Sequence, residues 1–172
     1  MKIGILSDTH TKVELTRITI EFLLQEGVEF FIHAGDIVEY EILELLKNSG
    51  VRYVAVYGNN DAHLVQYHND FNLVQEPYYF KVANTTFKLM HLPFYMSPDA
   101  QVVIFGHTHT FSAEFIKGSL FLNPGEVCAR SKPLSECVML EVDEQSFTLH
   151  YYTRKKEKTY KQKQILHYQR EK

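Results

Sequence analysis

The stretch KIGILSDTH, residues 2–10, decides the fold, because a short apolar run leads directly into an aspartate and a histidine. Such a run is typical of a strand buried on both faces of a parallel sheet. The pattern returns twice: residues 28–33 lead to Gly35-Asp36, and residues 51–57 lead to Gly58-Asn59. Three successive strands are therefore expected to place polar side chains at their carboxyl ends, where ligands bind in open α/β sheets.

Two helical patterns separate these strands. Thr11 and Glu14 form a candidate capping box, and apolar residues then recur at helical spacing until Gly27. A second helix is expected over residues 39–48. Strands that alternate with helices predict an α/β fold with a parallel sheet.

The second half of the chain is richer in strands, with hairpin turns expected at Asn84 and at Lys117-Gly118. The expected strands cover residues 78–82, 86–91, 102–105, 111–116, 120–122, 137–142 and 147–152. Two sheets that face each other, with helices outside, are the simplest packing. We expect one domain over residues 1–153, and a basic extension over residues 154–172 that is either helical or disordered.

The composition is that of a globular protein, with 45% hydrophobic and 23% charged residues among 172. The net charge of −3 hides a basic segment, because residues 154–172 hold 8 Lys/Arg and 2 Asp/Glu residues. This segment can bind nucleic acid, but we favour a solvated extension or one that neutralises acidic surface of the same or a neighbouring subunit. Neither a signal region nor a membrane span is recognisable in the sequence, and the two cysteines form no framework, so we expect a cytoplasmic protein.

The polar side chains at the strand ends are candidate metal ligands. Carboxylate, amide and imidazole donors suit Mn, Ni, Fe, Co or Zn better than Ca. Two such ions, ~3.5–4 Å apart, can share a hydroxide that attacks a phosphate ester clamped between them. We assign one ion to Asp8, His10 and His109, a second ion to Asn59, His91 and His107, and the bridging position to Asp36.

In this order, the motifs resemble those of the calcineurin-like metallophosphoesterase superfamily, and in particular its small single-domain YfcE-like phosphodiesterases. The resemblance rests on Asp8-Thr-His10, Gly35-Asp36, Gly58-Asn59-Asn60-Asp61, His91 and Gly106-His107-Thr-His109, and it extends to Asn123-Pro-Gly-Glu126. It implies a four-layer αββα sandwich of two mixed β-sheets flanked by helices, and a binuclear centre usually active with manganese. It also implies hydrolysis of phosphodiesters or phosphomonoesters, with the same seven ligands.

The chain departs from the family pattern at Asn60, where many members have histidine or cysteine. An amide is not a general acid near neutral pH, so we expect aryl esters, which are good leaving groups, to react faster than alkyl esters. His63 or His68 can replace the acid if their loop folds inward, although we favour exposed loop histidines for both. Asn60 and His63 are the candidate catalytic residues.

Two further departures lie at His91 and Glu126. His91 is followed by Leu-Pro-Phe, and residues 93–100 are too short and too proline-rich for a full helix, so we expect a site that is open on this side. Glu126 replaces the serine of the family pattern, which we interpret as a change compatible with the surface. His33 is interpreted as a core histidine or one that orients a ligand.

Two classes of function follow from the sequence. The first is a metal-dependent phosphodiesterase that acts on a small-molecule phosphate ester. The second is a non-catalytic interaction scaffold, similar to the scaffold subunit of retromer. All seven ligand positions are filled, which favours the enzyme. Tyr78 and Tyr79 can serve a subunit contact if the protein is a homo-oligomer.

Overall fold

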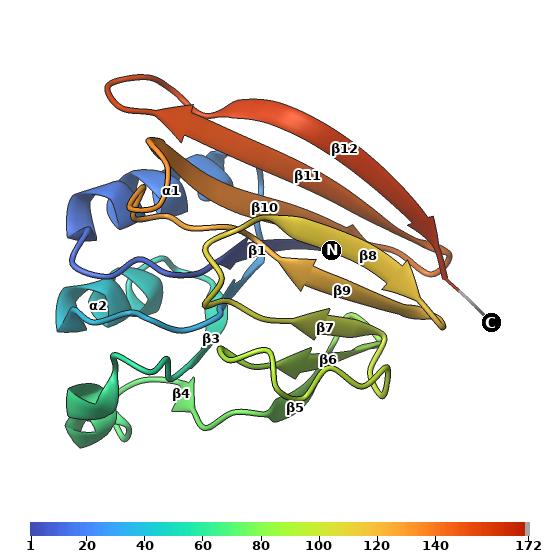
Figure 1. Ribbon diagram of the computed structural model, residues 1–172, viewed down its shortest axis with the longest axis horizontal. Coiled ribbons are helices and arrows are strands. Elements are labelled where there is room, and N and C mark those ends of the chain that lie inside the picture. Colours follow the sequence, from blue (N-terminus) through green and yellow to red (C-terminus); the bar gives the residue numbers. More distant parts are fainter. Residues whose placement is uncertain (171–172) are drawn as a thin grey trace.

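The computed structural model describes residues 1–170, and two mixed β-sheets face each other in it (Figure 1). Within this range, the first sheet has seven strands in the spatial order β12 (Lys161–Gln169), β11 (Ser146–Lys155), β10 (Leu134–Val142), β1 (Lys2–Leu6), β2 (Phe30–His33), β3 (Arg52–Val56) and β4 (Leu73–Val74). The second sheet of the described chain has five, in the order β5 (Tyr78–Val82), β6 (Thr85–Leu89), β7 (Val102–Ile104), β9 (Ser119–Asn123) and β8 (Ser112–Ile116). The predicted pair of mixed sheets is therefore confirmed.

The parallel strands β1, β2 and β3 form the part of the first sheet that carries the predicted motifs. They are joined by α1 (Val13–Gln25) and α2 (Tyr40–Lys47), and β3 is followed by the 3-10 helix η1 (Ala62–Tyr67). Lys12, not Thr11, is the N-cap of α1, and no side chain caps this helix, so the predicted capping box is wrong. Glu14 instead pairs with Arg17 one turn along the exposed face of α1.

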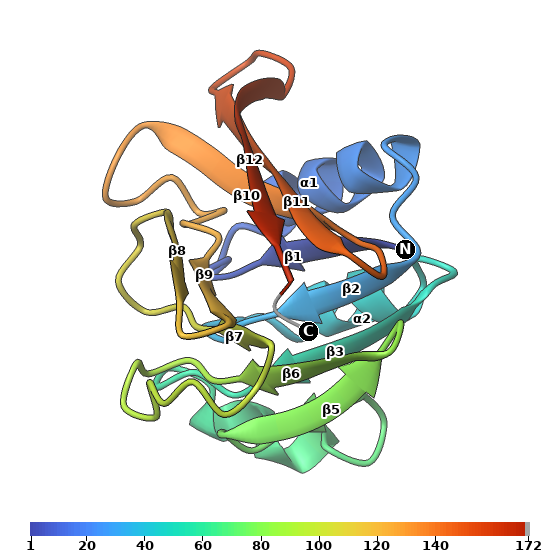
Figure 2. The same cartoon turned by 90° about the vertical axis from the view of Figure 1, so that its right-hand side faces the viewer.

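Buried side chains fill two layers on the two faces of the first sheet. Figure 2 shows α1 and α2 beside the strands of this sheet. Between the sheets, Ile3, Phe87 and Leu122 belong to one hydrophobic cluster. On the outer face, Leu23 of α1 and Leu46 of α2 belong to a second cluster with strand residues. The two α-helices thus hold the strand ends in place from one side.

A smaller cluster covers the outer face of the second sheet, where Val103, Phe105 and Phe121 pack against Met90 and Ala100. The described chain forms turns and bends between residues 91 and 101, without a helix, as the sequence predicts. Helices therefore flank the first sheet, whereas this short segment takes their place on the second.

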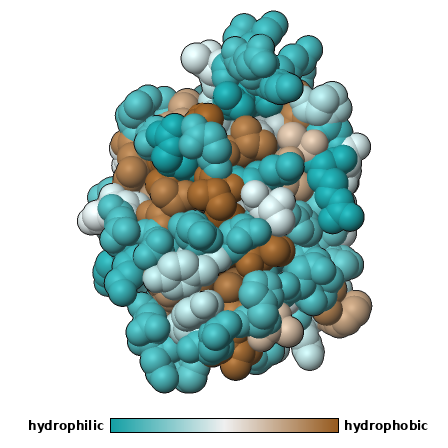
Figure 3. Space-filling model, turned by 90° about the vertical axis from the view of Figure 1, so that its left-hand side faces the viewer, coloured by the Kyte–Doolittle hydropathy of each residue, from teal (hydrophilic) through white to brown (hydrophobic). Residues whose placement is uncertain are grey.

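The basic extension ends β11 at Lys155, turns over residues 156–160 and forms β12. The expected helix or disorder is therefore wrong for residues up to 170, and residues 171–172 lie outside the described range. β12 pairs with β11 in antiparallel fashion, from Ser146↔Gln169 to Thr153↔Lys161. Between the two strands, Tyr160 is buried against α1, with its hydroxyl 2.7 Å from Thr19 Oγ1. The hydrophilic tip of this hairpin projects at the top of Figure 3. The predicted boundary at residue 153 falls inside β11 and stays a prediction.

In residues 1–170, no helix has the length and apolar character that a membrane crossing requires. Cys128 and Cys137 are both buried and free. Tyr78 packs against the main cluster, whereas Tyr79 is exposed and donates a hydrogen bond to Asp99 (2.9 Å), so the proposed subunit contact stays a prediction.

Candidate metal centre

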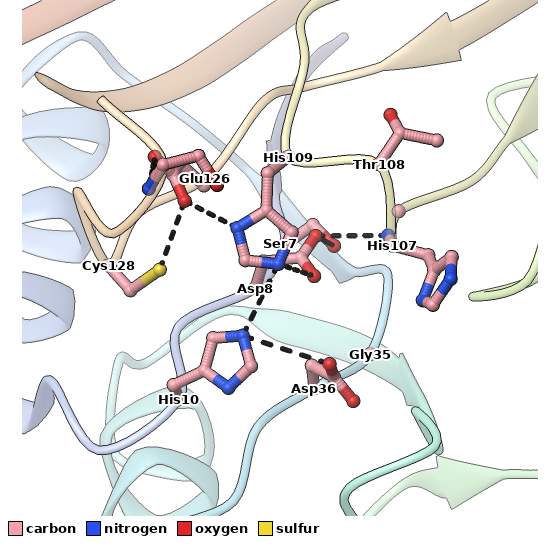
Figure 4. Close-up of polar contacts among 12 residues, drawn as sticks. Ser7, Asp8, His10, Gly35, Asp36, His107, Thr108, His109, Glu126 and Cys128 are labelled. Carbon is pink, nitrogen blue, oxygen red and sulfur yellow. Dashed lines mark hydrogen bonds and ion pairs between the residues drawn. The ribbon is translucent and has the colours of Figure 1, made fainter.

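The loops that follow β1, β2 and β7 meet at one edge of the two sheets. The Asp8 N–H donates to Gly35 O (3.0 Å), the His10 N–H donates to Asp36 O (2.9 Å), and the His107 N–H donates to Asp8 Oδ2 (3.2 Å). These contacts connect loops that lie far apart in the sequence, and Figure 4 shows their side chains converging.

Five of the seven predicted ligands have a left-handed backbone. Residues other than glycine adopt this conformation at a cost of about 1–3 kcal/mol, and they gather at functional sites. The φ angles are 53° at Asp8, 46° at His10, 54° at Asp36, 66° at His107 and 58° at His109. The hydrogen bonds between the loops therefore hold strained residues in place.

Two motif glycines allow these loops to approach each other. A Cβ atom on Gly58 would lie 2.1 Å from the backbone nitrogen of Asp36, and one on Gly106 would lie 2.2 Å from Ser7 Oγ. Both distances are far inside van der Waals contact, so a side chain at either position would push a predicted ligand or its neighbour away. The glycines of the motifs thus have a steric role.

A first group of donor atoms surrounds Asp8. Its Oδ2 accepts a hydrogen bond from Ser7 Oγ (2.6 Å), while Oδ1 lies 3.3 Å from His109 Nε2 and is buried without a hydrogen-bond partner in the described chain. Nε2 of His10 lies 3.5 Å from His109 Nε2. Burial raises the pKa of Asp8 above its usual value. A buried carboxylate oxygen without a donor is costly, and a cation at this point would satisfy it.

A second group contains Asn59, His91 and His107. Asn59 Oδ1 lies 3.0 Å from His91 Nε2 and 3.0 Å from His107 Nδ1. The other ring nitrogen of His91, Nδ1, lies 2.8 Å from the carbonyl oxygen of Ala34. A carbonyl can only accept, so Nδ1 carries the proton, and in the neutral form of the ring the Nε2 lone pair faces this group.

Asp36 lies between the two groups. Its Oδ2 is 3.7 Å from His10 Nε2, and its Oδ1 is 3.5 Å from His91 Nε2. Burial opposes ionisation, but the nearby His91 and the hydrogen bonds from Asn60 outweigh it and hold the pKa of Asp36 below its usual value. Donor atoms of Asp8, Asp36 and His91 lie within 4.8 Å of one another, and so do those of His10, His109 and Cys128. The donor set therefore fits divalent transition-metal ions.

The candidate catalytic residues make other contacts. Asn60 donates to Asp36 twice, from its backbone N–H to Oδ1 (3.0 Å) and from Nδ2 to Oδ2 (2.8 Å). His63 is exposed, with Nε2 2.7 Å from Val38 O, and His68 is also exposed. The roles of Asn60 and His63 in catalysis stay predictions.

His33 is a core histidine, as interpreted from the sequence. It is fully buried, with Nε2 3.0 Å from Thr9 Oγ1, and Nδ1 accepts the Gly35 N–H (3.2 Å). Burial lowers its pKa to about 3, so it is neutral. It supports the loops after β1 and β2.

Glu126 is fully buried, so its interpretation as a surface-compatible change is wrong. The reason is that its loop is hydrogen-bonded to the backbone before His10: the Val127 N–H donates to Ser7 O (3.1 Å), and the Cys128 N–H donates to Asp8 O (3.1 Å). The side chain forms a short hydrogen bond with His109 Nδ1 (Figure 4). Only the position of Glu126 in the Asn-Pro-Gly-Glu segment could have drawn attention to it.

Asp61 is a second residue whose role the sequence did not reveal. Its carboxylate accepts the N–H groups of Ile37 (3.1 Å), Val38 (2.8 Å) and Gly58 (2.7 Å). It therefore joins the loops after β2 and β3, which carry Asp36 and Asn59. Its place at the end of the Gly-Asn motif is the signal that could have identified it.

Comparison with known proteins identifies relatives. Residues 1–145 match the family described as the calcineurin-like phosphoesterase superfamily domain. A phosphodiesterase of Methanocaldococcus jannaschii is 29% identical over 160 residues, which cover 86% of this chain and 96% of the relative.

Solved structures share the fold. YfcE, a phosphoesterase from E. coli, has a TM-score of 0.68 at 23% identity, covering 86% of this chain and 91% of that chain. Vacuolar protein sorting 29 from Cryptosporidium parvum has a TM-score of 0.80 at 18% identity, covering 98% of both chains. At these identities the likeness concerns the fold alone.

Proposed function

The chain belongs to the calcineurin-like phosphoesterase superfamily, and from this premise we propose that it is a metal-dependent phosphoesterase that acts on phosphodiesters. The observation that carries the proposal is the position of Asp36 between two groups of donor atoms. One carboxylate in contact with both groups is the arrangement that a two-ion centre needs.

The proposed centre holds two divalent ions. Asp8, His10 and His109 would hold one ion, Asn59, His91 and His107 would hold the other, and Asp36 would contact both. When bound, the ions supply positive charge for the substrate phosphate and lower the pKa of water. We propose manganese, with nickel, iron, cobalt and zinc as alternatives, because this mixed set of oxygen and nitrogen donors suits each of them.

Hydrogen bonds from residues outside the centre orient these ligands. Ser7 Oγ donates to Asp8 Oδ2, which leaves Oδ1 free for a cation. Ala34 O accepts the Nδ1 proton of His91, which leaves the Nε2 lone pair toward Asn59. Partners of this kind orient ligands and raise their affinity for metal.

Asn60 favours esters whose leaving group needs no proton. Its amide donates to Asp36 and has no acidic proton to give, and the nearby His63 is bound to a backbone carbonyl. We propose that aryl and other activated phosphodiesters are hydrolysed faster than alkyl esters. The exposed side chains of Asn59, Asn60 and His107 support an open site that accepts substrates of varied size.

Two buried free thiols, Cys128 and Cys137, support the further proposal that the protein is located in the reducing cytoplasm.

Hydrolysis of bis-p-nitrophenyl phosphate, with and without added Mn²⁺, tests the function. Asp36→Asn keeps the shape of the side chain but removes its charge, so we expect the metal-dependent rate to fall by at least about 100-fold, which is ~2.7 kcal/mol in the barrier. Asp70→Asn is the matched control, because Asp70 is an exposed carboxylate outside the centre. Equal rates for wild type and Asp36→Asn, or no metal-dependent turnover, would favour the non-catalytic scaffold instead.

A further inference from the structure

Glu126 lies behind His109, on the opposite side of the imidazole ring from Asp8 (Figure 4). One ring nitrogen, Nδ1, is hydrogen-bonded to Glu126 Oε2, and the other, Nε2, lies 3.3 Å from Asp8 Oδ1. The carboxylate is fully buried and is not one of the predicted metal ligands. Its contact with the centre is therefore made through His109.

Hydrogen-bond donors surround both oxygens of Glu126. Oε1 accepts the backbone N–H groups of Ser131 (2.7 Å) and Lys132 (3.0 Å), while Oε2 accepts the Cys128 thiol (3.3 Å) as well as His109. A carboxylate with donors on both oxygens is in its ionised form, which can only accept. The proton of the short contact therefore belongs to His109 Nδ1, and in the neutral form of the ring the lone pair is on Nε2.

The segment that carries Glu126 also holds the backbone of His109. Lys132 Nζ donates to His109 O (2.7 Å) and pairs with Glu136 Oε2 (2.7 Å). Glu136 Oε2 in turn accepts the Glu126 N–H (3.1 Å). Both the ring and the left-handed backbone of His109 are thus fixed from residues 126–136.

We infer that Glu126 is a positioning residue that fixes the Nδ1–H tautomer of His109 and so directs its Nε2 lone pair toward the ion shared with Asp8 and His10. This inference rests on the proposed metal centre. A carboxylate behind a metal-binding histidine orients the ring and increases its basicity, and loss of such a partner lowers metal affinity by about 10–100-fold.

The tautomer itself can be measured in the metal-free wild-type protein. Long-range ¹H–¹⁵N correlation spectra of the histidine side chains distinguish a protonated Nδ1 from a protonated Nε2, and loss of signals in His109→Gln assigns the ring. We expect His109 to be protonated at Nδ1. A proton on Nε2 of His109 in the wild-type protein overturns the inference, independently of the results for any variant.

Glu126→Gln provides a second measurement, because the structure predicts how the new amide turns. The backbone N–H groups of Ser131 and Lys132 require an acceptor, so the amide oxygen stays on their side and its NH₂ group faces His109. This group can only donate to Nδ1, which moves the ring proton to Nε2 and removes the lone pair from the centre. We expect the spectrum to show the reversed tautomer and calorimetry to show Mn²⁺ affinity about 10–100-fold lower.

Glu26→Gln is the matched control, since Glu26 is a half-buried glutamate that accepts a hydrogen bond from the Tyr152 hydroxyl (3.0 Å) and lies beside Lys2, at the other end of β1 from Asp8. It should leave the tautomer of His109 and the Mn²⁺ affinity unchanged. A folded Glu126→Gln variant with an unchanged tautomer and affinity within about two-fold of wild type contradicts the inference. A wild-type protein that binds no Mn²⁺ refutes the proposed function instead, while the tautomer still decides the role of Glu126.

Discussion

Replacing Asp99 by asparagine is expected to destabilise the segment that leads away from His91. Asp99 Oδ1 lies 2.8 Å from Nζ of Lys88, whose side chain is 1% exposed, and Ser97 Oγ is also 2.8 Å from this ammonium group. Loss of the carboxylate leaves a buried charge with only neutral partners. Breaking a fully buried ion pair costs about 3–5 kcal/mol. Because 46% of the Asp99 side chain is exposed, solvent reduces the expected loss to about 1–2 kcal/mol.

Urea denaturation of wild type and Asp99→Asn measures this loss, which corresponds to a melting temperature lower by about 3–6 °C in a protein of this size. The double variant Lys88→Met/Asp99→Asn removes the orphaned charge and should recover part of the stability. A single variant as stable as wild type, or a double variant less stable than the single one, would refute the reasoning.

The contribution of Asp99 also depends on pH. The hydrogen bond from Lys88 lowers its pKa to about 2. The pKa in the unfolded chain is about 3.9. Since the folded pKa is the lower one, the stabilisation is complete above the unfolded pKa and is lost as the pH falls through about 2. The difference in unfolding free energy between wild type and Asp99→Asn should therefore shrink from pH 5 to pH 3.

Three further outcomes are expected. Asn60→His introduces a general acid, so hydrolysis of alkyl phosphodiesters should rise by about 10–100-fold, while hydrolysis of aryl esters should change little. Equal changes for both classes of ester in a phosphate-release assay would count against the role of Asn60. Tyr160→Phe removes the hydroxyl contact with Thr19 and should lower the free energy of unfolding, measured in urea, by ~1 kcal/mol. Tyr160→Ala also removes the packed ring and should lower it by ~3 kcal/mol or more, so equal losses in the two variants would contradict the packing role of the ring. Gly58→Ala should abolish Mn²⁺ binding in calorimetry, because the added methyl group meets the backbone of Asp36. Gly50→Ala has open space around it and a left-handed backbone (φ 82°), so it should lose some stability but bind Mn²⁺ normally.

The sequence was sufficient for most of the sheet framework because most buried strands leave a strong apolar signal. β12 was missed for a physical reason: most of its side chains are exposed, and lysine and glutamine dominate its first half. What holds it is backbone pairing with β11 and the packing of Leu166 and Tyr168 against the main cluster. Neither interaction is visible as a local pattern.

The candidate ligands could be proposed from the sequence because each follows a strand or belongs to a short motif in a recognisable order. Glu126 could not, since its burial depends on hydrogen bonds to the backbone of Ser7 and Asp8, far earlier in the chain. The contacts of Asn60 and His63 were equally hidden, because they depend on where Asp36 and Val38 lie in three dimensions. Sequence motifs thus predict which candidate ligands the fold brings together better than they predict the residues that support them.

The position of β1 has a consequence for the order in which the protein folds as it is made. β1 lies between β2 and β10, where Ile3 is paired with both Phe30 and Leu140. At about 5–20 residues per second, on the order of ten seconds of synthesis separate the first strand from its second neighbour. Val127 and Cys128, which hold the backbone of Ser7 and Asp8, also leave the ribosome late. The candidate metal centre therefore begins to form with β1 and its loop and is completed only after the segment that carries Val127 and Cys128 has been synthesised.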